Sequence, residues 1–153
     1  MPDAASLATY AQFFRIGLET GICTADEARE WALSVIEKMD SPPGEIIEVS
    51  WRKPLEHLIA DLNSVEGDPD LESASRWLLQ RLLESLPASN GTLHRAVRQA
   101  MQVARSIDAM DLYYDFDRID DGLQLAVTGV YGTVDTCREE FETEIREYLA
   151  KRR

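Results

Sequence analysis

Hydrophobic residues recur every three or four positions along most of the chain, which is the spacing of one face of an amphipathic helix. The clearest run follows Thr24, which stands three residues before Glu27 and so forms a capping-box pattern at a helix start. Related patterns place Asp68 and Pro69 at the start of another run and Thr136 at the start of the last. The pattern predicts helices over residues 6–20, 24–39, 51–62, 69–86, 93–107, 123–131 and 136–150, with a short helical segment at 45–50.

These runs indicate an all-α protein. The β-branched residues Ile46, Ile47 and Val49 could form one strand, but no other segment offers a strand to pair with it. A chain of 153 residues is long enough to bury about 70% of the surface that its unfolded form exposes, so it needs no metal or disulfide to fold. We therefore expect one compact domain over residues 1–153, with about seven helices and no significant sheet.

Acidic residues outnumber basic residues by 28 to 16, which gives a formal net charge of −12. This charge repels nucleic-acid backbones and anionic membrane surfaces, so we expect neither as a partner. No apolar run approaches the roughly 18 to 20 residues of a membrane span, and the start of the sequence lacks the basic flank of a signal peptide. Cys23 and Cys137 stand far apart, which suits reduced thiols. The sequence predicts a cytoplasmic protein.

The residue types that metal or nucleotide chemistry needs are missing at the required spacings. A di-iron bundle needs a glutamate three residues before each of two histidines, but Pro54 and Gly91 hold those positions. The sequence has no HExxH, zinc-type cysteine pair, P-loop or GxGxxG motif. Residues 117–122 resemble a calcium loop only in part, because Ile119 and Thr128 occupy ligand positions. We expect no metal and no cofactor.

One histidine is a candidate for acid–base chemistry. His57 and Asp61 are four residues apart on a predicted helix, so the carboxylate could orient the imidazole. Such pairs are commonly surface contacts, and no nucleophile is tied to this one by spacing. Cys23 precedes a helix start, where a thiolate can be stabilised, and burial as a small hydrophobic residue is the alternative. We expect no catalytic residue.

Charge is unevenly distributed over the second half of the chain. Residues 76–105 carry five arginines against one acid, whereas residues 108–121 carry six aspartates against one arginine. Aromatic residues stand among these aspartates, and the combination is typical of a surface that binds a basic protein. In the alternative interpretation, the aromatic rings pack in the core and the aspartates pair with the arginines upstream. The candidate partner-binding residues are Asp108, Asp111, Tyr113, Tyr114, Asp115, Asp117, Asp120 and Asp121.

Two segments resemble proteins of toxin–immunity systems. The stretch Asp111-Leu112-Tyr113-Tyr114, in its acidic surroundings, resembles the aspartate and paired-tyrosine segment by which nuclease-bacteriocin immunity proteins bind their basic toxins. The family has a proline after the tyrosine pair, where this chain continues with Asp115. Residues 31–50 look like segments of small bacterial helical proteins, some of which accompany polymorphic toxins. The resemblance implies a small helical inhibitor whose partner is a cognate toxin.

Three functions follow as hypotheses. The first is a non-catalytic acidic binding protein, of the immunity or inhibitor type, that neutralises a basic protein toxin. The second is a helical regulatory or scaffold protein, possible as a homodimer, whose acidity serves solubility. The third is an enzyme built around His57. The first requires that the tyrosine pair at 113 and 114 be exposed.

Overall fold

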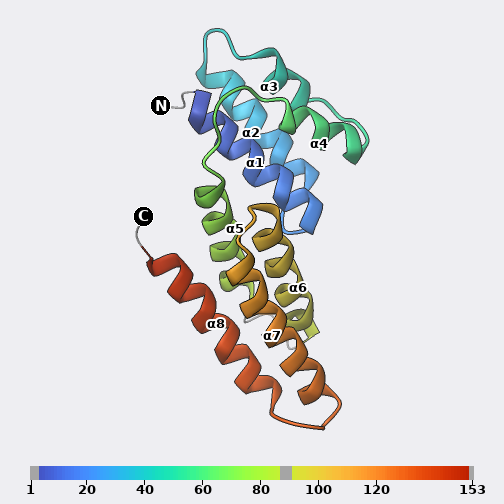
Figure 1. Cartoon of the computed structure of the whole chain (residues 1–153). Coiled ribbons are helices and arrows are strands. Elements are labelled where there is room, and N and C mark those ends of the chain that lie inside the picture. The colour runs from blue at the N-terminus through green and yellow to red at the C-terminus, as the bar shows by residue number, and fades with distance from the viewer. Residues whose placement is uncertain (1–3, 87–90, 152–153) are drawn as a thin grey trace. The chain divides into compact units, whose positions relative to one another are not determined.

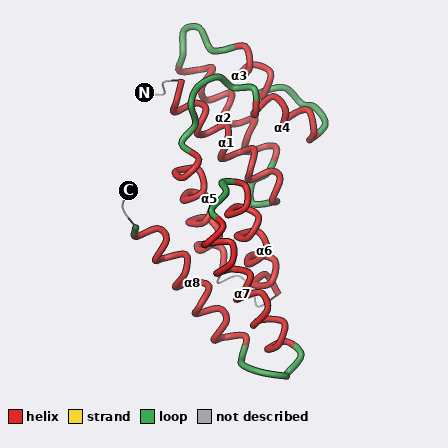
Figure 2. The backbone as a smooth tube through the Cα atoms, viewed as in Figure 1, coloured by secondary structure: helices red, strands yellow, loops and turns green. Residues whose placement is uncertain are grey.

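The computed structural model describes residues 4–86 and 91–151, and every secondary-structure element in these two ranges is a helix (Figure 1; Figure 2). The prediction of an all-α protein without a sheet is confirmed for this part of the chain, with eight helices there rather than about seven. The helices are α1 (Ala4–Thr20), α2 (Ala25–Lys38), α3 (Gly44–Val49), α4 (Leu55–Asn63), α5 (Leu71–Ser85), α6 (Gly91–Ser106), α7 (Met110–Val127) and α8 (Val134–Ala150).

The helices gather into two compact units, Met1–Ala74 and Ser75–Arg153. In the first unit α1 packs on α4, and α3 packs on both α2 and α4. Trp31 of α2 covers Phe14 of α1 with the ring centroids 5.3 Å apart. The unit has an apolar core that includes Ile16, Ile46, Leu58 and Leu62. The expectation of one domain over residues 1–153 stays a prediction.

Helix starts in the first unit follow the capping residues only in part. The capping box of Thr24 and Glu27 is confirmed, because each side chain accepts a hydrogen bond from the other residue's backbone N–H. The expected cap at Asp68 is wrong. Asp70 caps α5 instead, and its carboxylate accepts a hydrogen bond from the backbone N–H of Ser73 at 3.1 Å. Helix α4 starts at Leu55, directly after Pro54, and not at residue 51.

In the second unit α7 packs against both α6 and α8. Phe116 of α7 and Phe141 of α8 meet edge to face with their ring centroids 5.5 Å apart, and both side chains are fully buried. The C-terminal end of α8 is held by Arg76 of α5, whose guanidinium donates to the carbonyl oxygens of Leu149 at 2.9 Å and Lys151 at 2.6 Å. These bonds satisfy carbonyl groups that a helix end leaves without intrahelical donors.

Helix α7 is longer and ends earlier than the sequence pattern indicates. The sequence pattern predicts no helix over residues 111–121 and a separate helix over residues 123–131. The structure instead has one helix from Met110 to Val127 that passes through Gly122 without a break. Residues 128–133 then form the turn into α8, and both Gly129 and Gly132 adopt positive φ angles there. This turn is called the tip below.

The start of α8 also differs from expectation. The expected capping box at Thr136 is wrong, since Thr133 is the cap and its hydroxyl oxygen accepts the backbone N–H of Thr136 at 3.1 Å. The two cysteines, Cys23 and Cys137, are both buried and form no disulfide, in agreement with the expected thiols. Burial is the main cause that raises the pKa of the Cys137 thiol, and Glu140 adds to it. Within the described residues, no helix combines the length and apolar character that a membrane crossing needs.

Candidate protein-binding surface

The predicted binding residues on α7 lie on different sides of this helix. Leu112, Phe116, Ile119 and Leu123 point into the core, so the remaining positions face the neighbouring helices or solvent. The aspartates at 111 and 115 are four residues apart and so lie on one side of the helix. Those at 117, 120 and 121 lie on another side. The structure therefore does not bring all eight predicted residues together on one surface.

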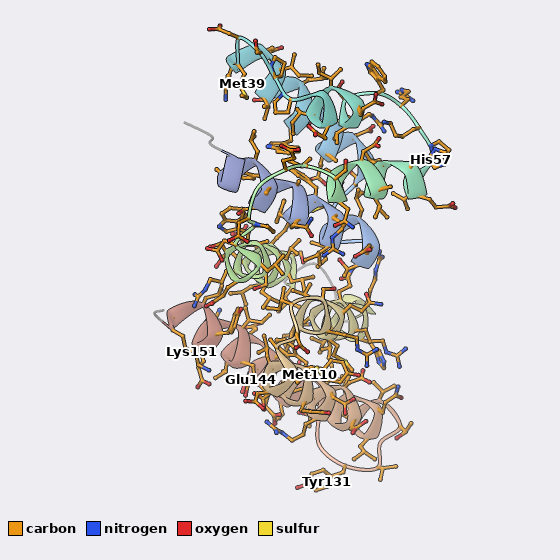
Figure 3. All side chains as sticks on the ribbon, turned by 45° about the horizontal axis from the view of Figure 1, so that its top comes forward. Met39, His57, Met110, Tyr131, Glu144 and Lys151 are labelled. Carbon is orange, nitrogen blue, oxygen red and sulfur yellow. The ribbon has the colours of Figure 1, made fainter. Side chains whose placement is uncertain are left out.

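Asp111 and Asp115 line a groove between α7 and α8. The groove encloses about 480 Å³, and its lining contains five carboxylates and one lysine. Three of the carboxylates come from the predicted segment and two come from α8. In Figure 3, Met110 of α7 lies close to Glu144 of α8, with Lys151 farther along α8. We call this feature the acidic groove, and its charged residues are Asp108, Asp111, Asp115, Glu144, Glu147 and Lys151.

Backbone geometry places one of these carboxylates at the start of α7. Asp108 has a φ of 59°, in the left-handed region that aspartate tolerates better than most residues. Its backbone N–H donates to the carbonyl of Arg105 at 3.1 Å, and the N–H of Ala109 donates to the carbonyl of Ala104 at 2.9 Å. These bonds fix the turn between α6 and α7. The Asp108 side chain is therefore held exposed beside the first turn of α7.

The carboxylates of the groove repel one another. Burial is the largest cause that raises the pKa of Glu144 above its usual value, followed by the negative charges of Asp115 and Glu147. Arg118 and Lys151 act in the opposite direction but do not cancel the rise. A carboxyl group whose ionised form is disfavoured by its neighbours marks a place where a positive charge would be favourable.

The two predicted tyrosines have different environments. The guanidinium of Arg105 donates to the hydroxyl of Tyr113 at 2.9 Å and lies over its ring, 4.8 Å from the centroid, so this side chain is partly covered. Tyr114 is 60% exposed and meets Tyr113 edge to face with the centroids 5.6 Å apart. Tyr114 thus fulfils the requirement of an exposed ring, whereas Tyr113 fulfils it only in part.

The second group of aspartates contacts α6 through Asp120. Asp117, Asp120 and Asp121 each offer a carboxylate oxygen within 4.8 Å of the others. Asp120 lies at ion-pair distance from two α6 side chains, 3.3 Å from His94 Nε2 and 3.6 Å from Arg98 Nε. The alternative in which the basic and acidic segments compensate each other therefore applies on this side. Exposed carboxylates often gather in this way without an ion, so the expected absence of a metal stays a prediction.

Sequence reasoning missed the two glutamates of α8. Glu144 and Glu147 are three residues apart, so they share one side of the helix, next to the buried stripe of Phe141 and Ile145. The spacing of these two glutamates beside the apolar stripe is visible in the sequence. It did not show that this side of α8 faces the start of α7, because such a pairing depends on helix packing.

The candidate histidine His57 lies on α4, as does Asp61, its possible partner. His57 is exposed on α4, and it shares a shallow groove of about 410 Å³ with Trp51, Lys53 and Asp61. The Asp61 carboxylate is bound by the Lys53 ammonium group. This carboxylate has Lys53 as its partner, so the structure gives no support to the alternative in which Asp61 orients the imidazole.

The acidic groove and Tyr114 are thus the part of the predicted surface that remains open to a partner. In comparisons with known proteins, no protein-family model, no curated protein and no solved structure matches the chain.

Proposed function

We propose that this protein is a non-catalytic binding protein that receives a basic protein partner in the acidic groove, in the manner of an immunity or inhibitor protein. The observation that carries this proposal is the grouping of five carboxylates around one groove of about 480 Å³, with a single lysine among them. The groove is therefore concave and negatively charged, and the proposed partner is positively charged.

The chemistry of the groove favours guanidinium and ammonium groups. Hydrogen bonds between such cations and carboxylates are shorter and stronger than neutral ones, and an arginine can engage a carboxylate with two of them. Burial is the largest cause of the raised pKa of Glu144, and a cation placed beside it would also offset the negative charges of Asp115 and Glu147, which add to the rise. The net charge of −12 would steer a basic partner toward the protein before contact.

Tyr114 supplies the apolar part of the proposed contact. On the helix surface its neighbours at three positions before and after are Asp111 and Asp117, so the exposed ring stands between carboxylates. Aromatic side chains in such places commonly dominate the binding energy, since they bury a large area and lose little conformational freedom. The resemblance of residues 111–114 to immunity proteins supports the same assignment and suggests a cognate toxin as the partner.

The test is capture of partners from a lysate of the source organism, with identification of the captured proteins. We compare the wild type with Asp111→Asn/Tyr114→Ala, which removes one charge and one exposed ring from the surface. The matched control is Glu30→Gln/Leu33→Ala on α2, which removes one exposed charge and one exposed apolar side chain elsewhere. We expect a basic protein to be captured by the wild type and the control and lost with the surface variant. Equal capture by all three would contradict the proposal.

A helical scaffold that assembles with its own copies is the second candidate. It is favoured by the exposed apolar side chains of the tip and the preceding turn of α7, where Val127, Val130 and Tyr131 are 64%, 70% and 77% exposed. These residues lie outside the acidic groove, so the two functions do not compete for one surface.

A further inference from the structure

Helices α6 and α7 carry rows of opposite charge on their outer sides. Arg95, Arg98 and Arg105 of α6 are all exposed, and their spacing of three and seven residues puts them on one side of the helix. On α7, Asp117 and Asp121 are four residues apart and lie opposite the buried stripe. Because α6 and α7 pack on each other, the basic row and the acidic row run side by side.

Some charged side chains of each row are engaged within the chain and others are not. Arg98 is engaged by Asp120, and Arg105 is engaged by Tyr113. Arg95, Asp117 and Asp121 have no ion-pair partner among the residues that the structure describes. A shallow groove of about 280 Å³ lies between α6 and α7, and its lining includes Arg98 and Arg105 of the basic row together with Met101, Tyr113 and Asp120. The α6–α7 face therefore offers unpaired charges of both signs and a concave surface.

The segment that contains the tip carries no charged side chain. Residues 122–134 contain no charged side chain, although 29% of the whole chain is charged. The backbone N–H groups of Val130 and Tyr131 both donate to the carbonyl of Leu125, at 2.9 and 3.3 Å, so the tip is a hydrogen-bonded turn. Figure 3 shows Tyr131 at the end of the second unit. Exposed apolar side chains held in a fixed turn are suited to contact with another protein.

We propose that two copies of this chain form a parallel homodimer through the α6–α7 face and the tip. A two-fold axis parallel to α6 and α7 places the basic row of each copy over the acidic row of the other, and the same operation brings the two tips together. Arg95 then pairs with Asp117 and Asp121 of the partner copy.

A second copy fits this face better than other occupants do, because the face is self-complementary. Two molecules with a charge of −12 repel each other over most of their surface, and they can meet only where charge is balanced or absent. The α6–α7 face is balanced, and the tip has no charge. The acidic groove uses the side of α7 where Asp111 and Asp115 lie, so it stays open in the dimer, whereas Tyr114 stands next to Asp117 and borders the dimer face. The inference does not depend on the proposed binding of a basic partner, and it deepens the second candidate function, which rests on the same tip.

The first test is sedimentation velocity over a concentration series up to millimolar protein. We expect the wild type to dimerise, and Asp121→Arg or Arg95→Glu to weaken the dimer by at least about tenfold, because each places like charges opposite one another. Asp121→Arg combined with Arg95→Glu exchanges the two charges and should restore dimerisation. The controls Glu37→Arg and Arg52→Glu, both at exposed positions of the first unit, should leave the wild-type constant unchanged.

The second test concerns the orientation of the two copies. Val130→Cys places a thiol on the tip, and both native cysteines are buried. Under mild oxidation this variant should form an interchain disulfide much faster than Glu37→Cys, whose thiol lies outside the proposed interface. A wild type that stays monomeric at every concentration, a dimer that the charge reversals do not weaken, or equal cross-linking of the two thiols would each overturn the proposal.

Discussion

At the scale of single residues, the partners of each aspartate decide what it can do. Asp115 has Arg118 at 3.5 Å and Asp120 has Arg98 at 3.6 Å, whereas Asp111 has no ion-pair partner among the described residues. The sequence identifies these acids as a group but does not separate them, because their pairing depends on side chains that other helices supply. The sequence also leaves open whether Tyr114 packs in the core or is exposed, and the structure shows that it is exposed.

Glu144 gives a prediction that depends on pH. Its folded-state pKa is raised, so the folded protein holds this proton more tightly than the unfolded chain does. The stabilising effect of that proton is present below the unfolded pKa and is lost as the pH rises through the folded pKa. At neutral pH the ionised carboxylate faces Asp115 and Glu147 and is unfavourable, despite Arg118 and Lys151 nearby.

We therefore expect Glu144→Gln to raise the melting temperature at pH 7 by about 1 to 3 °C, a small effect because the site is partly solvated. The difference should decrease as the pH falls through the folded-state pKa of Glu144 and vanish below the unfolded-state pKa, where the side chain is protonated in both states. Thermal unfolding followed by circular dichroism at several pH values measures this. Glu37→Gln on α2, exposed and far along the chain, serves as the control, and a lower melting temperature for Glu144→Gln at pH 7 would refute the argument.

At the scale of elements, the sequence predicts helices well where a cap and an apolar stripe coincide. The capping box at Thr24 starts α2 where expected. The pattern fails for α7, because it predicts a separate helix after Gly122, whereas the structure has one helix that continues through Asp121 and Gly122. The apolar stripe through Phe116 and Leu123 continues across that pair, and tertiary burial of the stripe outweighs the low helix propensity of glycine.

The continuity of α7 can be tested with two glycines. A Cβ atom at Gly122 would meet only Cys137 Sγ, at 3.8 Å, which is an ordinary contact. Gly122→Ala should therefore stabilise the protein by about 0.5 to 1 kcal/mol, since alanine loses less backbone entropy in a helix. Gly129 has open space but a φ of 75°, so Gly129→Ala should destabilise by about 1 kcal/mol or more. Urea denaturation of both variants measures the two changes, and a destabilising Gly122→Ala would indicate that α7 is broken there.

At the scale of the whole molecule, the net charge of −12 suggests a basic partner as a hypothesis, but it does not locate the surface that would bind it. The acidic groove arises only when the start of α7 meets the second half of α8, and these segments are about 30 residues apart in the sequence. The grouping of the helices into two units likewise could not be read from the sequence pattern, because helical periodicity gives the buried side of each helix and not its neighbour.

The most direct test of the account is calorimetric measurement of the affinity for the captured basic protein as a function of salt. We compare the wild type with Asp111→Asn/Glu147→Gln in the acidic groove and with Glu30→Gln/Glu37→Gln on α2, so that both variants lose two charges. The account predicts that wild-type affinity falls as salt rises, that the groove variant binds at least about tenfold more weakly, and that the α2 variant binds nearly as the wild type. Equal affinities for the two variants, or an affinity that does not change with salt, would contradict the assignment of the acidic groove as the binding site.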